Sequence, residues 1–243
     1  MEKRILVTGG TRGLGLEISR YLVAQGYTVV ATGRTVSEPL QALIDDPATA
    51  GRLAFMPLEL AETDKLHEFI NELKRRHGPL WGIVNNAAVA RDGVLATLHE
   101  SDVHQTILVN VTATILLTKY ALRTMLAQRA GRVINISSIV SHSGFNGLSV
   151  YAASKSAMLG FTRSLAREVG KVGITVNAVC PGYMETDMSA GLDDAQLDSI
   201  RRRSAIRRLT EPADVASAVG FLLSEEANGI TGTTLTVDAG STA

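Results

Sequence analysis

The hydrophobic positions of the chain form two alternating patterns. Short runs rich in valine, isoleucine and leucine are typical of strands that are buried on both faces. Longer segments between them repeat apolar residues every three to four positions, as amphipathic helices do. The alternation predicts a parallel sheet with helices on both faces. The predicted strands are Arg4–Thr8, Tyr27–Thr32, Leu53–Pro57, Trp81–Asn85, Gly131–Ile136, Ile174–Val179 and Thr233–Val237.

Helical patterns fill most of the intervals between these strands. No composition shift, Pro-rich linker or internal repeat marks a second domain. We therefore expect residues 1–243 to form a single α/β domain with a doubly wound parallel sheet of about seven strands. The predicted helices lie near Leu14–Gln25, Thr63–His77, Ser101–Arg129, Tyr151–Val169 and Pro212–Ser224.

One connection, residues 183–210, is longer than the others. About thirty residues lie where a compact turn between strand and helix would suffice. The segment carries Asp193-Asp194 and the basic runs Arg201–Arg203 and Arg207-Arg208. Long connections of this kind often close over a site, so we expect a substrate lid. The alternative is an ordinary pair of surface helices.

The charge balance narrows the classes of function. The chain has 24 basic and 24 acidic residues and no formal net charge, which argues against a general nucleic-acid or membrane-surface role. Cys180 is the single cysteine, so an intramolecular disulfide is impossible and a cytoplasmic setting is favoured. No run approaches the roughly 20 apolar residues that span a bilayer. Five histidines without metal-ligand spacing predict no metal site.

The most informative chemical signal is Tyr151 with Lys155 four positions later. Positions four apart share a helix face, so the ammonium can sit beside the phenol. An unperturbed phenol has a pKa of about 10, and a neighbouring cation would lower that pKa toward the working range of a proton donor. Ser138, thirteen residues before Tyr151, supplies a hydroxyl donor. Ser137 is an alternative, and Ser138 could merely cap its strand.

A glycine loop follows the first predicted strand, with the sequence Thr8-Gly9-Gly10-Thr11-Arg12-Gly13-Leu14-Gly15. Such glycines let the backbone approach a pyrophosphate, and the helix that follows supplies N–H groups and a favourable dipole. The second strand ends in Thr32-Gly33-Arg34 instead of the acidic residue that would bind the ribose of NAD. Arg34 and Arg12 could clamp a 2′-phosphate, which predicts NADP(H). The alternative is two solvated arginines without preference.

Together these motifs resemble the short-chain dehydrogenase/reductase superfamily over essentially the whole chain. The resemblance implies a Rossmann-type fold. The matching motifs are Thr8-Gly9-x-x-x-Gly13-x-Gly15, Asn85-Asn86-Ala87, Asn110, Ser138, Tyr151-x-x-x-Lys155 and Pro181-Gly182. Within the superfamily the chain is most similar to the 3-oxoacyl-[acyl-carrier-protein] reductases, in the segments Ser164-Leu-Ala-Arg-Glu-Val, Gly173-Ile-Thr-Val-Asn, Pro181-Gly-Tyr-Met-Glu-Thr-Asp-Met and Ile230-Thr-Gly.

The resemblance implies roles for four catalytic residues. Tyr151 would donate a proton to a ketone oxygen while hydride arrives from NADPH. Lys155 would lower the pKa of Tyr151 and hold the nicotinamide ribose, and Ser138 would orient the carbonyl. Asn110 would hold a water that links Lys155 to solvent, unless it is only a polar residue that bends its helix.

The resemblance also implies a set of cofactor-binding residues. Asn86 would contact the adenine ribose or stabilise the turn after the fourth strand, and Glu59 replaces the Asp or Asn usual near the adenine. Ala88 replaces a glycine of the family pattern, and the C-terminal residues depart from it as well. The implied set is Gly9, Thr11, Arg12, Gly13, Leu14, Gly15, Arg34, Glu59, Leu60, Asn86, Ala87, Tyr151, Lys155, Pro181, Gly182, Met184 and Thr186.

The substrate implied by the resemblance is a 3-oxoacyl thioester of acyl carrier protein or coenzyme A. Arg129, Arg132 and Lys171 could form a docking patch for the acidic carrier near the mouth of the site, or an ordinary solvated basic face. Alternatives are a ketoreductase or alcohol dehydrogenase for a small ketone, steroid, sugar or polyketide, and a scaffold that has lost catalysis. The family also implies a homotetramer, with the two longest predicted helices at a dimer interface.

Overall fold

The fold is seen in a computed structural model that describes residues 2–185 and 193–243, and its centre is a seven-stranded parallel sheet. The strand order is β3-β2-β1-β4-β5-β6-β7. This confirms the predicted fold class, and β6 is longer than predicted. The strands are β1 (Arg4–Thr8), β2 (Thr28–Gly33), β3 (Leu53–Pro57), β4 (Gly82–Asn85), β5 (Gly131–Ile136), β6 (Ile174–Pro181) and β7 (Thr234–Val237).

The strand order reverses direction between β1 and β4. From β1 the chain builds the sheet outward through β2 and β3, and then returns to add β4 on the other side of β1. The loops that follow β1 and β4 therefore diverge at the carboxyl edge of the sheet. In open α/β sheets such a switch point leaves the crevice in which ligands bind.

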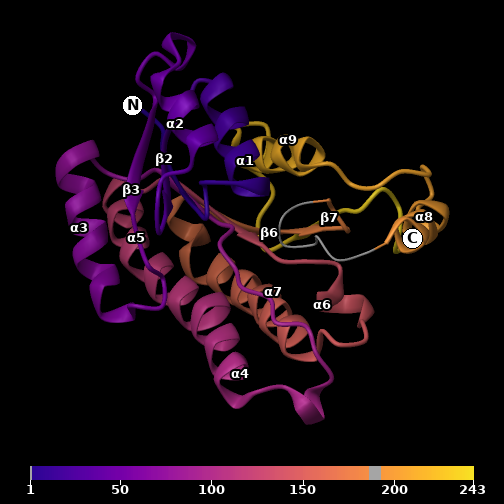
Figure 1. Cartoon of the computed structure of the whole chain (residues 1–243). Helices are drawn as coiled ribbons and strands as arrows, with labels where there is room; N and C mark the ends of the chain where they lie inside the picture. The colour runs from indigo at the N-terminus through magenta and orange to yellow at the C-terminus, as the bar shows by residue number, and fades with distance from the viewer. Residues whose placement is uncertain (1, 186–192) are drawn as a thin grey trace.

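Helices cover both faces of the sheet (Figure 1). On one face lie α3 (Leu66–His77), α5 (Thr114–Gln128) and α7 (Ser149–Val169), and on the other lie α1 (Gly13–Ala24) and α9 (Pro212–Leu223). Helix α2 (Glu38–Asp45), which was not predicted, also lies on the second face through Leu40.

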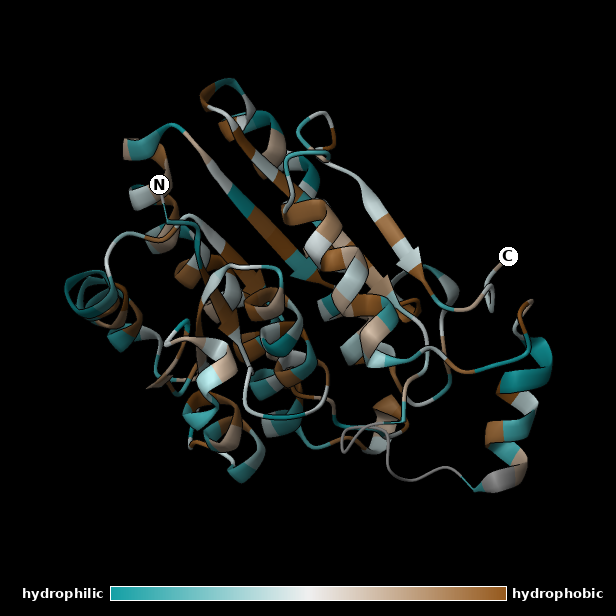
Figure 2. Cartoon of the chain, turned by 90° about the horizontal axis from the view of Figure 1, so that it is seen from above, coloured by the Kyte–Doolittle hydropathy of each residue, from teal (hydrophilic) through white to brown (hydrophobic). Residues whose placement is uncertain are grey.

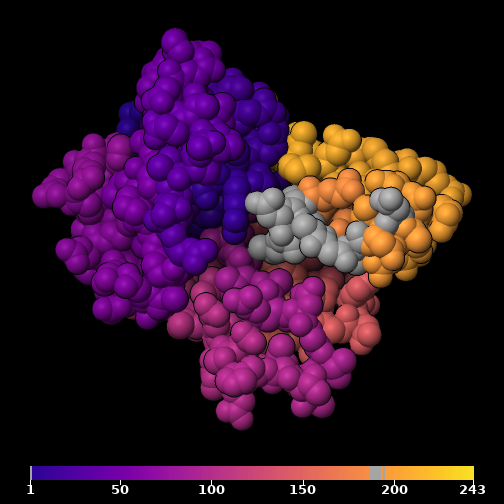
Figure 3. Space-filling view, viewed as in Figure 1, coloured from indigo at the N-terminus to yellow at the C-terminus, as the bar shows by residue number. Residues whose placement is uncertain are grey.

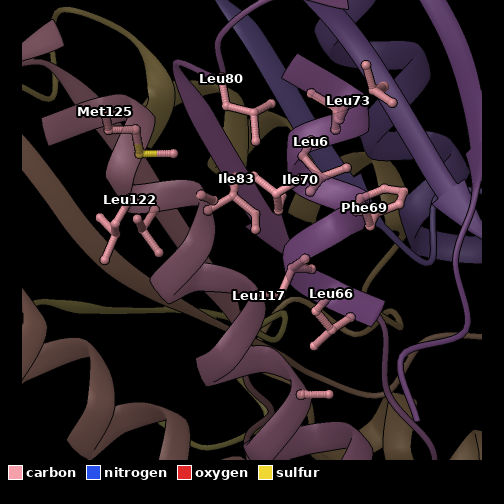
Figure 4. Close-up of a cluster of buried hydrophobic side chains, with 14 of the residues drawn as sticks. Leu6, Leu66, Phe69, Ile70, Leu73, Leu80, Ile83, Leu117, Leu122 and Met125 are labelled. Atoms are coloured by element: carbon pink, nitrogen blue, oxygen red, sulfur yellow. The ribbon is translucent and has the colours of Figure 1, made fainter. Parts of the chain in front are cut away.

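Each face of the sheet has its own hydrophobic core, because successive strand residues point to opposite sides. Leu6 belongs to one core, whereas its neighbours Ile5 and Val7 belong to the other. Full burial of such a side chain contributes about 1.5–3 kcal/mol to folding. The core beneath α3 and α5 includes Leu6, Leu66, Phe69, Ile70, Leu73, Leu80, Ile83, Leu117, Leu122 and Met125 (Figure 4).

The segment predicted as one helix over Ser101–Arg129 is divided. It consists of α4 (Glu100–Ile107), a π-helical stretch η4 (Leu108–Ala113) and α5. A π-helical turn is uncommon and often marks a functional position. The hydrophobic period that predicted the helix cannot detect one extra residue in a turn, so the sequence did not reveal this interruption.

The long connection after β6 contains the helix α8 (Asp194–Arg203), which lies apart from the sheet at the right of Figure 1. It begins with a capping box between Asp193 and Gln196 and is largely hydrophilic (Figure 2). One of its arginines binds acidic neighbours within the chain: Arg201 lies 2.8 Å from Asp198 and 3.8 Å from Glu185. The remaining short elements are α6 (Val140–Ser143), η1 (Pro47–Thr49), η2 (Thr63–Lys65), η3 (Leu95–Thr97) and η5 (Gly170–Val172).

None of the helices in the described ranges is both long enough and apolar enough to cross a membrane.

Candidate active site

The loops that follow β1, β4, β5 and β6 meet at the carboxyl edge of the sheet. They carry the glycine loop, Asn86, Ser138 and Gly182 respectively. In the space-filling view the N-terminal residues (indigo), the segment near residues 90–110 (magenta) and the C-terminal part (orange to yellow) lie around the centre of one face (Figure 3). The fold thus brings together motifs that are far apart in the sequence.

Tyr151 and Lys155 lie in the first turns of α7. The Nζ of Lys155 is 5.6 Å from the centroid of the Tyr151 ring. Lys155 is only 4% exposed, and its Nζ donates a hydrogen bond of 2.8 Å to the carbonyl oxygen of Ile136. Because Ile136 ends β5, this bond ties the ammonium to the strand that leads into Ser138.

Burial dominates the acid–base properties of this pair. It raises the pKa of Tyr151 to about 12, and the negative charge of Asp92 contributes in the same direction. Burial likewise lowers the pKa of Lys155 to about 8. In this structure burial outweighs any lowering by Lys155, so the pKa of Tyr151 lies above its ordinary value. The ammonium lies beside the ring and bonds to Ile136, and the loss of hydration that both groups suffer prevails.

The two adjacent serines have different surroundings. The hydroxyl of Ser137 is buried and donates to the carbonyl oxygen of Lys155 at 2.9 Å, so it joins β5 to α7. The Oγ of Ser138 is half-buried and accepts a bond of 3.4 Å from the amide of Val140. The hydroxyl proton of Ser138 can still be donated to a ligand. This geometry favours Ser138 over Ser137 as the site hydroxyl.

Asn110 lies in the π-helical stretch, 3% exposed. Its side-chain oxygen accepts from the amide of Val89, and its Nδ2 donates to the carbonyl of Val89, both at 2.8 Å. A further bond of 3.0 Å reaches the Oγ of Ser154, which itself donates to the carbonyl of Tyr151. The Asn110 amide thus links the loop after β4 to α7.

The glycine loop is closely packed against the turn after β4. Gly9 has φ +62°, and a Cβ there would lie 3.0 Å from the Cα of Ala87. A Cβ on Gly15 would collide with the carbonyl oxygen of Gly9. Gly13 begins α1 with φ +51°, and the N-cap residue Arg12 makes no side-chain cap. The first N–H groups of α1 are therefore without a capping side chain, as an anion-binding helix terminus requires.

Asn86 fastens this loop from the neighbouring strand. Its Nδ2 donates to the carbonyls of Thr8 at 2.9 Å and Gly9 at 3.3 Å. The Thr8 hydroxyl oxygen in turn accepts from the amides of Asn86 and Ala87 at 2.9 and 3.0 Å. The turn-stabilising role expected as one alternative for Asn86 is thus present in the structure.

The two arginines expected at a 2′-phosphate, Arg12 and Arg34, lie in two loops that contact each other. Ser37 donates a hydrogen bond to the carbonyl of Thr11, and a Cβ on Gly33 would lie 2.9 Å from the Thr11 side chain. Arg34, next to Gly33, and Arg12, next to Thr11, are both exposed. The structure therefore brings the two guanidinium-bearing segments together at one end of the crevice.

The remaining predicted cofactor residues differ in burial. Glu59 is half-buried and its carboxylate accepts from the amide of Ala61 at 3.1 Å, whereas Leu60 is buried in the core. Leu14 and Met184 are half-buried and pack against the core beneath α1. Thr186 lies outside the described residues.

Pro181 ends β6, and Gly182 follows it next to the C-terminal strand. The amide of Gly182 donates to the carbonyl of Val237 at 2.9 Å, and a Cβ on Gly182 would lie 2.8 Å from the Cα of Asp238. Asp238 accepts hydrogen bonds from Gly240, Ser241 and Thr242. The C-terminal turn therefore supports the backbone of this side of the site.

Two residues of the site were missed in the sequence. Asp92 lies in the irregular loop after β4, where no hydrophobic period indicates a position. Ser154 lies between Tyr151 and Lys155, and its relation to Asn110 depends on packing between distant segments. The sequence signal available for Ser154 was its position three residues after Tyr151, on the same helix face.

The expected docking patch at the mouth of the site is contradicted for Arg132. This residue is second in β5, and Ser138 follows the other end of that strand, on the order of 20 Å away. Arg132 is 5% exposed, and its guanidinium lies 5.1 Å from the ring centroid of Trp81. Arg129 and Lys171 are exposed at this same amino edge of the sheet. Within one chain, these three residues do not form a patch beside Tyr151.

Comparison with known proteins supplies independent information. Residues 9–242 match the family described as "Enoyl-(Acyl carrier protein) reductase". The chain is 37% identical over 240 residues to the 3-oxoacyl-[acyl-carrier-protein] reductase FabG of Haemophilus influenzae, covering 98% of this chain and 97% of that protein. It is 36% identical over 240 residues to carbonyl reductase family member 4 of Xenopus tropicalis, covering 99% and 98%.

A solved structure has the same architecture. The structure of ElxO with NADP bound superimposes with a TM-score of 0.88 and 31% sequence identity, covering 99% of each chain. A second structure, of a tyrosine-to-phenylalanine variant of ElxO with NADPH bound, has the same TM-score and identity.

Proposed function

The chain belongs to the short-chain dehydrogenase/reductase superfamily, and from this premise we propose that it reduces the ketone of a 3-oxoacyl thioester with NADPH. The observation that carries the proposal is the position of Tyr151, Lys155 and Ser138. All three lie at the carboxyl edge of the sheet, next to the crevice at the strand-order switch. The reductases of carrier-protein thioesters among the relatives support this substrate class.

NADP(H) is the cofactor that the crevice residues fit. Gly9 and Gly13 have φ +62° and +51°, a backbone turn that favours glycine, and α1 begins without a capping side chain. Exposed Arg34 and Arg12 supply positive charge where a 2′-phosphate would lie. The NADP-bound neighbour of the same architecture supports this cofactor. Once bound, the reduced nicotinamide supplies the hydride that the ketone carbon accepts.

Tyr151 then acts as the proton donor. Its raised pKa keeps the phenol protonated at neutral pH, which is the form that can donate to the ketone oxygen. Ser138 donates a hydrogen bond to the same oxygen and fixes its orientation. The charged form of Lys155 stabilises the phenolate that proton transfer leaves behind.

Asn110 and Ser154 position these groups. The Asn110 amide holds Ser154, and Ser154 holds the carbonyl of Tyr151, so the π-helical stretch is connected to the proton donor. We propose that a water on the Asn110 backbone returns a proton to Tyr151 through Lys155 after each turnover.

The wider organisation is also part of the proposal. Residues 1–243 form one NADP-binding domain, residues 183–210 act as a substrate lid, and the protein works in the cytoplasm. Four copies assemble as a dimer of dimers, with α4, α5 and α7 at the dimer interface. Exposed Ile107 and Leu126 on the first two of these support such an interface.

Turnover of NADPH with a panel of substrates tests the proposal. Acetoacetyl-carrier protein and acetoacetyl-CoA should be reduced, and crotonyl-CoA, which offers a carbon–carbon double bond, should not. Strong reduction of free ketones with no reduction of either 3-oxoacyl thioester would favour the small-ketone alternative. Reduction of crotonyl-CoA alone would point to an enoyl reductase.

The cofactor choice has its own test. NADPH should support a higher kcat/KM than NADH, and Arg34→Gln should lower this preference about tenfold or more, because it removes a charged partner of the 2′-phosphate. Arg75→Gln, at an exposed arginine of α3, is the matched control and should leave the preference unchanged. A wild-type preference for NADH would overturn the NADP(H) assignment.

A further inference from the structure

Two loops meet beside Tyr151 and form one continuous surface. One is the connection from β4 to α4, residues 86–99, and the other joins α6 to α7, residues 144–148. The amide of Gly93 donates to the carbonyl of Gly147 at 2.9 Å. Gly147 has φ +78°, and a Cβ there would lie 3.7 Å from the Gly93 amide. Because α7 begins immediately after the second loop, this contact fixes both loops relative to Tyr151.

The surface formed by these loops is apolar. Val94, Leu95 and Phe145 are 60%, 59% and 60% exposed, although large hydrophobic side chains usually lie inside. Val94 directly follows Gly93, and Phe145 lies two residues before Gly147. The three side chains therefore flank the contact between the loops and offer a surface for an uncharged, apolar molecule.

One carboxylate stands within this apolar surface. Asp92 is exposed and directly precedes Gly93. Its neighbour Arg91 contacts Asp102 instead, with 3.5 Å between Nε and Oδ1. In the described part of the chain Asp92 takes part in no ion pair, so its negative charge is uncompensated there. Its loop is held near the start of α7 by the bond from Gly93 to Gly147, four residues before Tyr151. The charge of Asp92 also contributes to the raised pKa of the phenol.

We propose that Asp92 is a specificity-determining residue that selects neutral ketones and rejects ketones carrying a nearby negative charge. The inference rests on the proposed function. Any ketone reduced here must place its oxygen within hydrogen-bond reach of Tyr151. In a free 3-oxo acid the carboxylate is separated from the ketone carbon by a single methylene, so it enters the field of Asp92. A 3-oxoacyl thioester has no charge at that position and escapes the repulsion.

The other titratable groups near Tyr151 do not offset the repulsion between Asp92 and an anionic ketone. Lys155 is buried and bonded to Ile136, and Cys180 on β6 is a buried thiol whose pKa burial raises. His142 on α6 is exposed and hydrogen-bonds with Ser141. These groups are the same in wild type and in an Asp92 variant, so a change in selectivity between the two reports the Asp92 charge.

The test compares two substrates that share a 3-oxo group and differ in charge. Acetoacetate is an anion at neutral pH, whereas ethyl acetoacetate is neutral. Asp92→Asn should raise the ratio of kcat/KM for acetoacetate over ethyl acetoacetate about tenfold. Asp92→Glu, which keeps the charge, should retain most of the wild-type ratio. Glu100→Gln, which removes an exposed carboxylate from the start of α4, is the matched control and should leave the ratio unchanged.

The outcomes separate this inference from the function on which it rests. If wild type reduces the neutral ester but Asp92→Asn leaves the ratio within about twofold, the inference is wrong and the function stands. The inference is also wrong if Asp92→Glu changes the ratio as much as Asp92→Asn, since the effect would then be one of shape. If wild type reduces neither the ester nor a 3-oxoacyl thioester, the proposed function is wrong and the inference falls with it.

Discussion

Lys155 and Arg132 are buried cations at opposite edges of the same sheet. Lys155 is 4% exposed beside the carboxyl edge, and Arg132 is 5% exposed at the amino edge. Burial lowers the pKa of both groups. The amine of Lys155 reaches a pKa of about 8, within the range where proton transfer is useful. A guanidinium stays charged at any working pH, so burial gives Arg132 no comparable chemistry.

Lys155 and Arg132 also differ in the groups that they contact. Lys155 has one carbonyl partner and lies beside the ring of Tyr151, a group with chemistry of its own. Arg132 donates to the carbonyl of Gly131 and to Asn228, and it stacks on Trp81, which also contacts Lys3. The comparison teaches that a buried cation marks a candidate site only when its charge can change and a reactive group faces it.

The largest effect should come from Tyr151→Phe. Removal of the phenolic proton donor should lower kcat/KM by about 10²–10⁴-fold, with little change in the free energy of unfolding. Steady-state kinetics and urea denaturation measure the two quantities. Residual activity within tenfold of wild type would mean that another group donates the proton.

The next effect is a pH dependence of stability due to Lys155. Its pKa of about 8 lies below the ordinary lysine value of 10.5, so between these pH values the unfolded chain binds a proton that the folded chain lacks. Stability should therefore rise with pH across this window, by up to about 3 kcal/mol. Urea denaturation of wild type and Lys155→Met from pH 7.5 to 10 isolates this contribution.

Arg132 provides the matched control for that experiment. Arg132→Met should show no such difference from wild type over the same pH range, because a guanidinium does not titrate there. If the wild type and Lys155→Met have parallel pH profiles, the pKa of Lys155 is not depressed.

A smaller loss is expected for Arg132→Ala at the amino edge. The free energy of unfolding should fall by about 2 kcal/mol, because the cation–π contact with Trp81 and two hydrogen bonds disappear. The kcat/KM for a small ketone should stay within about twofold, since the site lies at the other edge. Arg129→Ala, at an exposed neighbour, should change neither quantity. A large loss of activity in Arg132→Ala would show that the two edges are coupled.

The smallest predicted effect distinguishes the role of Ser137 from that of Ser138. Ser137→Ala should cost about 1 kcal/mol of stability through the lost bond to the carbonyl of Lys155. Ser138→Ala should leave stability nearly unchanged and lower kcat. Equal losses of kcat in both variants would remove the distinction drawn from their hydrogen bonds.

Periodicity and spacing predicted much of this molecule. The runs that gave β1, β3 and β5 matched the observed bounds, because buried parallel strands are continuous in apolar residues. The relation of Tyr151 to Lys155 follows from helix geometry alone. Such features depend on residues that are neighbours in sequence.

Features that depend on distant segments were not predictable in this way. The bond from Lys155 to Ile136 and the effect of Asp92 on Tyr151 arise only when the loops are docked. The π-helical stretch at Asn110 keeps the same hydrophobic period as the α-helices that flank it. The expected place of Arg132 at the mouth of the site was wrong. Its position near the start of a predicted strand already assigns it to the amino edge of the sheet.

The place of β4 beside β1 has a consequence for folding kinetics. The chain completes β2, α2, β3 and α3 before it returns to pair β4 with β1, so this contact closes a long loop. Asn86 cannot hold the glycine loop until then. A dinucleotide therefore has no crevice to bind during the early steps. Excess ligand should slow unfolding of the finished protein without accelerating the first stages of folding.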